Sequence, residues 1–201
     1  MMKIGIDFDN TIVSYEELFY NIAREKKIIP HELPQKKTAV RNYLRSVGQE
    51  TQWTLMQGEV YGPHMSNAKP FPYVVEFMVK AEQAGHQIFI ISHKTKYPFV
   101  GPQYDLHATA KLWINTNLIF HKAPLIDTNR IFYELTKEKK ISRIQSLECD
   151  FFIDDLPEIL LMPGFPDQTK KILFDPDFTN GNFDYRYSIA NSWLKIEELI
   201  L

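Results

Sequence analysis

The fold is decided near the start of the chain by the stretch Lys3-Ile4-Gly5-Ile6-Asp7-Phe8-Asp9-Asn10-Thr11. Its first part is a short apolar run, which is typical of a buried β-strand. The run ends abruptly in acidic and hydroxyl residues. Asp7 and Asp9 are two positions apart, so their side chains can share one face of an extended chain. This stretch predicts a polar site at the end of a buried strand.

Three further apolar runs end in polar residues in the same way. They are residues 87–91 before Ser92, 150–153 before Asp154 and Asp155, and 171–174 before Asp175. Helical patterns separate these runs, and the runs do not alternate between apolar and polar residues. That combination predicts an α/β fold, a Rossmann-like parallel sheet with helices on both faces. Ligands bind such sheets at the carboxyl ends of the strands, where these polar residues gather.

Four amphipathic helices are expected around this sheet. Residues 73–84 form one, which should stop at Gly85. Leu106, Ala110 and Trp113 mark a second, Thr136 is the expected N-cap of a third, and a last helix is expected over residues 187–199. These helices supply the apolar faces that a parallel sheet needs on both sides.

Residues 14–69 have a different character. They are rich in charged residues and helix formers, with apolar residues at helical spacing and breaks at Pro30 and Pro34. We interpret them as a small helical insertion. The expected organisation is therefore a core of residues 1–13 and 70–201, interrupted by a helical unit over residues 14–69.

Composition narrows the class of protein. The 201 residues carry a net charge of -2, which provides no electrostatic footprint for a nucleic acid polymer. No segment approaches the roughly 20 apolar residues that span a bilayer, so no membrane partner is expected. A single cysteine, Cys149, and a start without a signal-peptide pattern predict a cytoplasmic protein. The composition is compatible with a monomer or a homodimer.

The acids at the strand ends predict a metal site. Carboxylates brought together repel one another unless a cation lies between them. The candidate ligands Asp7, Asp9, Asp154 and Asp155 are hard oxygen donors, without a cysteine or histidine cluster. Such donors favour Mg²⁺ over zinc or copper.

Mg²⁺ beside a carboxylate suits chemistry at phosphorus. A carboxylate can attack phosphate and form an aspartyl-phosphate, provided that positive charge neutralises both partners. Asp7 is the candidate nucleophile, and Asp9 can protonate the leaving alcohol and later activate water. Ser92 and nearby backbone amides can hold phosphate oxygens.

At this point the sequence resembles the haloacid dehalogenase superfamily. Residues 7–11 resemble its first motif, DxDxT, and Ile90-Ile91-Ser92 resembles its second. Residues 151–155 resemble its acidic fourth motif. The third motif is a lysine at the start of the preceding helix, for which Lys137 fits best because Ile141 and Ile144 follow on the core side. Lys139 and Lys140 compete for this role.

The resemblance implies Asp7 as nucleophile, Asp9 as acid and base, and Mg²⁺ held by Asp7, Asp154 and the Asp9 carbonyl. It also implies that residues 14–69 are a helical cap, as in some 5'(3')-deoxyribonucleotidases. The stretches 92–95, 136–140 and 154–158 more closely resemble a bacterial group of such hydrolases that has no assigned substrate. A second acid two positions after the nucleophile favours a phosphatase over a dehalogenase.

The sequence also contains candidates for contact with the substrate. Thr11, His93 and Lys94 are candidates because they follow the catalytic strand ends, although His93 and Lys94 also suit a loop surface. The leading prediction is an Mg²⁺-dependent phosphomonoesterase acting on a small phosphorylated metabolite, such as a nucleotide or sugar phosphate. Two alternatives are a non-catalytic module that binds Mg²⁺ and phosphate for regulation, and a phosphotransferase to an acceptor other than water.

Overall fold

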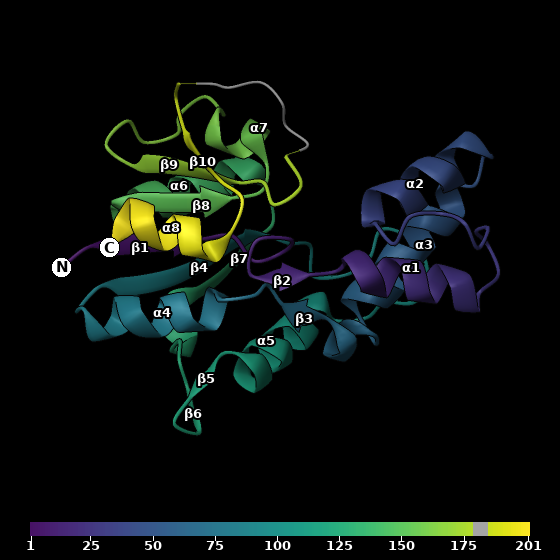
Figure 1. Ribbon diagram of the computed structural model, residues 1–201, viewed down its shortest axis with the longest axis horizontal. Coiled ribbons are helices and arrows are strands. Elements are labelled where there is room, and N and C mark those ends of the chain that lie inside the picture. Colours follow the sequence, from purple (N-terminus) through teal and green to yellow (C-terminus); the bar gives the residue numbers. More distant parts are fainter. Residues whose placement is uncertain (179–184) are drawn as a thin grey trace. The chain divides into compact units, whose positions relative to one another are not determined.

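The computed structural model describes residues 1–178 and 185–201 (Figure 1). Its chain divides into two compact units. Residues 1–13, 70–94 and 118–201 form the first, which we call the core unit. Residues 14–69 and 95–117 form the second, which we call the helical unit. Each is described separately below.

The core unit is built on a six-stranded sheet in the order β10-β9-β8-β1-β4-β7. Every pair of neighbours in it is parallel. The strands are β1 (Lys3–Ile6), β4 (Gln87–His93), β7 (Ile131–Glu134), β8 (Phe151–Asp154), β9 (Lys170–Phe174) and β10 (Ser188–Ala190). The predicted α/β fold with a parallel sheet is thus confirmed.

Helices cover both faces of this sheet (Figure 1). On one face lie α6 (Lys137–Leu147) and the short α7 (Pro157–Leu160). Ile141 and Ile144 of α6 are buried in a cluster with Phe152 and Leu173 of the sheet. Helix α6 begins after Thr136, as predicted, and the Thr136 hydroxyl accepts a hydrogen bond from the backbone N–H of Lys139.

The other face is covered by α4 (Val74–Gln83) and α8 (Trp193–Ile200). Aromatic rings dominate this interface: the centroid of Trp193 lies 5.2 Å from that of Phe77 and 5.8 Å from that of Phe174. The indole Nε1 of Trp193 also donates a hydrogen bond to the carbonyl oxygen of Thr11, at 3.1 Å. Helix α8 is therefore tied directly to the loop that follows β1.

The prediction of one helix over residues 187–199 was wrong in its first part. Residues 188–190 instead form strand β10 at the edge of the sheet, where Ile189 pairs with Leu173. The helix begins after Ser192, whose hydroxyl accepts a hydrogen bond from the backbone N–H of Lys195. A strand of three residues is too short to show the alternation of apolar and polar side chains that marks a strand. The helical spacing of the residues that follow it therefore dominates the sequence pattern.

Short elements connect these parts. The pair β2 (Val13–Ser14) and β3 (Lys69–Pro70) lies where the chain leaves the core unit and returns to it. The core unit also carries a small hairpin, β5 (Ile119–Phe120) and β6 (Ala123–Pro124), and the 3-10 turn η2 (Thr128–Arg130). Within residues 1–178 and 185–201, no helix combines the length and apolar character needed to cross a membrane.

The helical unit consists of α1 (Glu16–Glu25), α2 (Lys37–Ser46), α3 (Glu50–Tyr61), the 3-10 turn η1 (Met65–Asn67) and α5 (Leu106–Asn117). Aromatic packing joins its helices: Phe19 of α1 stacks on Trp53 of α3, with ring centroids 4.8 Å apart. The hydroxyl of Tyr15 donates to the sulfur of Met65, which is itself buried. Trp53 and Met65 thus belong to the internal core of this unit.

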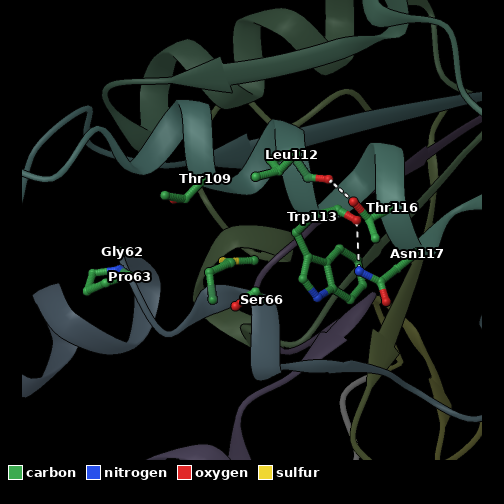
Figure 2. A pocket seen from close by; sticks show the side chains of 9 residues that line it. Gly62, Pro63, Ser66, Thr109, Leu112, Trp113, Thr116 and Asn117 are labelled. Atoms are coloured by element: carbon green, nitrogen blue, oxygen red, sulfur yellow. Dashed lines mark hydrogen bonds between the residues drawn. The ribbon is translucent and has the colours of Figure 1, made fainter.

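Residues 95–117 group with the helical unit, whereas the sequence analysis counted them in the core. Two hydrogen bonds explain the grouping. Trp113 Nε1 donates to the carbonyl of Ala68 at 2.8 Å, and Thr109 Oγ1 donates to the carbonyl of Tyr61 at 2.8 Å. Figure 2 shows the largely apolar cavity of about 260 Å³ between α5 and the turn at η1. The polar side chains of Thr116 and Asn117 in its wall bond to carbonyls of their own helix.

Gly5 of β1, which pairs with Phe152 of β8, is tightly packed. A Cβ atom added at Gly5 would lie 2.6 Å from Phe152 Cδ2 and 3.1 Å from Cys149 Sγ. We expect Gly5→Ala to lower the free energy of unfolding by about 1–3 kcal/mol, because the ring must move within a packed core. Urea denaturation measures this change.

The cause can be isolated with a double-mutant cycle. Because Phe152→Leu removes the clashing ring atoms, its combination with Gly5→Ala should cost less than the sum of the two single changes. Strictly additive costs would mean that the Phe152 ring is not what restricts position 5.

Candidate active site

The candidate site lies at the carboxyl ends of three neighbouring strands, β8, β1 and β4. Asp154 ends β8, Asp7 follows β1, and Ser92 is the next-to-last residue of β4. The backbone N–H of Asp7 still donates to the carbonyl of Ile153 at 2.9 Å, so the ladder of the sheet continues into the site. The parallel sheet therefore brings together residues that are up to 147 positions apart in the sequence.

Three carboxylates gather at this edge of the sheet. Asp7 and Asp154 are buried, with 5% and 0% of their surface exposed, and Asp155 is half-buried. One oxygen from each lies within 4.8 Å of the others, an arrangement that could hold a metal ion. Hard oxygen donors at this spacing fit Mg²⁺. The side chain of Asp9, a further predicted ligand, is not a member of this group.

A buried lysine lies between two of these acids. Lys140 Nζ is 2.5 Å from Asp7 Oδ1 and 2.6 Å from Asp154 Oδ2, and only 2% of the lysine side chain is exposed. The second oxygen of Asp154, Oδ1, accepts the backbone N–H of Leu156 at 2.9 Å. Both oxygens of Asp154 therefore have donors, and Asp7 has a cation on one oxygen.

Lys137, the lysine that the sequence pattern favours for this position, lies elsewhere in the structure. Its Nζ pairs with Oε1 of the exposed Glu158 at 3.0 Å, and Lys139 is exposed. The buried positions of α6 are 140, 141 and 144, so Lys140 is on the inner face, four residues before Ile144. The i, i+4 spacing between Lys140 and Ile144 is the signal that could have identified it.

Burial and the contact between the opposite charges of Asp7 and Lys140 shift the pKa values of these two residues in opposite directions. Desolvation raises the pKa of Asp7; the Lys140 ammonium opposes the shift, and the charges of Asp154 and Asp9 add to it. Burial alone would lower the pKa of Lys140, but contact with Asp154 and Asp7 outweighs burial and raises it. The cluster has more negative than positive charge, which is the condition that favours a bound cation.

Asp9 is held by a different lysine. Lys94 Nζ lies 3.0 Å from Asp9 Oδ1 and 2.9 Å from Asp9 Oδ2. Lys94 is buried, although its place in the sequence also suits a loop surface. The structure thus separates the two acids of the first motif, with Lys140 on Asp7 and Lys94 on Asp9.

Two of the predicted site residues have buried hydroxyls. The side chains of Thr11 and Ser92 are 0% and 1% exposed, and neither hydroxyl has a hydrogen-bond partner among the described residues. Burying such a group without a partner costs about 1–3 kcal/mol, so it is rarely found without a reason. An oxygen-rich ligand would satisfy hydroxyls placed in this way.

The remaining predicted residues lie around this centre. His93 is largely exposed at the end of β4, and partial desolvation of its ring together with the charge of Lys140 lowers its pKa. Asp175 is buried after β9, and its backbone N–H donates to the carbonyl of Ala190 at 2.9 Å. Neither side chain belongs to the group of three acids.

No protein-family model matches the chain. Two bacterial proteins are similar in sequence over most of their length. A Bacillus cereus protein named "Putative nucleotidase" is 28% identical over 165 residues, which cover 79% of each chain. A protein of Oceanobacillus iheyensis with a similar name is 24% identical over 164 residues, which cover 80% of each chain.

Solved structures with the same fold include a HAD-superfamily hydrolase from Ehrlichia chaffeensis, at 12% identity and a TM-score of 0.56, covering 100% of this chain and 97% of that one. A "predicted phosphatase" from Clostridium acetobutylicum has 14% identity, a TM-score of 0.59 and coverage of 99% and 97%. The L-2-haloacid dehalogenase RSc1362 has 9% identity, a TM-score of 0.57 and coverage of 100% and 98%. At these identities the likeness concerns the fold.

The position of Lys140 can be tested through stability. Lys140→Met leaves two buried carboxylates without their cation, so we expect a loss of about 3–5 kcal/mol in the free energy of unfolding. Lys137→Met and Lys139→Met remove exposed charges and should each cost under about 1 kcal/mol. Urea denaturation with a metal chelator present measures all three. A larger loss for Lys137→Met than for Lys140→Met would contradict this arrangement.

Proposed function

Because the chain has the fold of the haloacid dehalogenase superfamily, as its motifs predict, we propose that it is a Mg²⁺-dependent phosphomonoesterase. The observation that carries the proposal is the position of Asp7. Its carboxylate lies in a cluster with Lys140 and two further acids, and β1, which it follows, pairs with the strand that carries Ser92. A nucleophile, positive charge and oxygen-binding hydroxyls are the components that phosphate-ester hydrolysis requires.

In the proposed first step, an Asp7 oxygen attacks phosphorus and the bond from phosphorus to the ester oxygen breaks. The products are an aspartyl-phosphate and an alcohol. Lys140 neutralises the charge that Asp7 and the phosphate bring together, and the hydroxyls of Thr11 and Ser92 donate to phosphate oxygens. Mg²⁺ held by Asp7, Asp154 and Asp155 would supply the remaining positive charge on the phosphate.

Asp9 handles the protons in both steps. It gives a proton to the leaving ester oxygen as the first bond breaks. It then takes a proton from a water molecule that attacks phosphorus, which releases phosphate and restores Asp7. This role distinguishes a phosphatase from a dehalogenase, because a halide leaves without a proton. The fold alone does not decide between them, since a dehalogenase is among the structural neighbours.

We further propose that the substrate is a small phosphorylated metabolite. Nucleoside monophosphates are the first class to test, because both curated relatives are named as nucleotidases. Sugar phosphates are the second. The helical unit, residues 14–69 together with 95–117, is the proposed cap that determines which leaving group is accepted. It differs from the expected cap by the addition of residues 95–117.

The nucleophile is tested by Asp7→Asn. An amide attacks phosphorus poorly, so we expect turnover of p-nitrophenyl phosphate and of nucleoside monophosphates to fall by about 10³-fold or more. Asp167→Asn changes an exposed acid outside the site and should leave activity unchanged. Far-UV circular dichroism checks that both variants are folded. Wild-type turnover in Asp7→Asn would exclude the aspartyl-phosphate route.

The metal site is tested by thermal unfolding with and without Mg²⁺. A cation that binds only the folded protein raises its stability, by about 2.7 kcal/mol at a concentration 100 times the Kd. We expect this increase in the wild type and in Asp167→Asn. It should be much smaller in Asp155→Asn, which loses one of the three grouped oxygens. An equal response in Asp155→Asn would place the ion elsewhere.

A further inference from the structure

A second buried lysine carries a further inference, which rests on the proposed function. Lys94 is two residues beyond Ser92, directly after β4. Its ammonium contacts both carboxylate oxygens of Asp9, at 3.0 Å and 2.9 Å. A two-oxygen contact restrains the rotation of a carboxylate more than a single hydrogen bond does.

Lys94 is itself fixed from several directions. Its backbone N–H donates to the carbonyl of Glu134 on β7 at 2.9 Å, so its main chain extends the ladder of the sheet. Its Nζ lies 5.7 Å from the centroid of the Phe8 ring. The Lys94 side chain is 4% exposed and that of Asp9 is 20% exposed, so the acid is the accessible partner of the pair. The lysine supports Asp9 from the buried side.

This arrangement is energetically costly, which is why it suggests a role beyond folding. Fixing a lysine side chain costs rotamer freedom, and burying its charge adds a desolvation penalty. An apolar side chain of similar volume would fill the same space without either cost. The cost is explained if the orientation of Asp9 matters for function.

The two acids of the first motif need different orientations. Asp7 must face phosphorus, whereas Asp9 must reach the ester oxygen that leaves from phosphorus. Like charges two residues apart also repel each other. In the folded chain the two carboxylates pair with separate lysines, Asp7 with Lys140 and Asp9 with Lys94.

We propose that Lys94 is a positioning residue that orients Asp9 for proton transfer to the leaving group. This replaces the expectation that Lys94 contacts the substrate. Lys94 acts through Asp9 and forms or breaks no bond to the substrate. Its effect should therefore depend on how much the leaving oxygen needs a proton.

The test compares two kinds of leaving group in Lys94→Met. p-Nitrophenolate leaves readily without a proton, whereas the ribose oxygen of a nucleoside 5'-monophosphate does not. General acid catalysis contributes about 10²–10⁴-fold, so release of nucleoside in the first turnover should slow by about 10²-fold. Release of p-nitrophenol in the first turnover should slow by no more than about 3-fold. The KM for either substrate should change little. Lys195→Met, which removes an exposed, ion-paired lysine of the core unit away from the proposed cap, is the control and should behave as wild type.

Two further variants keep the test decisive. Lys94→Gln retains a donor of similar reach, and Lys94→Arg retains the charge as well, so Arg should restore nucleoside release more than Gln does. Circular dichroism identifies a variant that does not fold, in which case Lys94→Gln and Lys94→Arg carry the comparison. An equal slowing of both substrates, or a raised KM with unchanged kcat, would overturn the proposal. A wild-type protein that hydrolyses neither ester overturns the proposed function itself, and the role of Lys94 with it.

Discussion

The contact of Lys140 with Asp7 and Asp154 is the interaction on which the site depends. Two carboxylates from neighbouring strands could not both be buried at this distance without a cation between them. The lysine comes from α6, so the helix must dock with the correct rotation to place its ammonium there. The same rotation buries Ile141 and Ile144 against the sheet. Packing and charge neutralisation are therefore satisfied by one orientation of one helix.

This coupling explains why the acids can be both stable and reactive. The sheet fixes their backbones, and the apolar cluster beneath α6 fixes the lysine. What is left over is negative charge, which favours a bound divalent cation. The buried hydroxyls of Thr11 and Ser92 have no partner among the described residues, which is compatible with the proposed contacts of this centre with phosphate oxygens. Its polar groups are arranged before any ligand arrives.

Much of the fold could be predicted from the sequence because its signals are local. Apolar runs that end in polar residues marked the strands β1, β4, β8 and β9, and Thr136 marked the start of α6. The predictions that differ from the structure concern residues whose conformation or partner is determined by tertiary contacts. Three lysines occur within four positions of α6, and only the rotation of the helix selects Lys140. The edge strand β10 owes its conformation to pairing with β9. The pair of Lys94 and Asp9 spans 85 positions, which no local pattern encodes.

The hydrogen bond from Trp193 to the carbonyl of Thr11 has a consequence for how the protein is made. These residues are 182 positions apart, and the bond fixes the loop that carries Asp7 and Asp9. At about 5–20 residues per second, a ribosome needs roughly 10 to 40 seconds to synthesise the chain between them. Throughout that interval the nascent loop lacks its tether. The proposed phosphatase activity would therefore emerge late in biosynthesis, only after Trp193 has been synthesised.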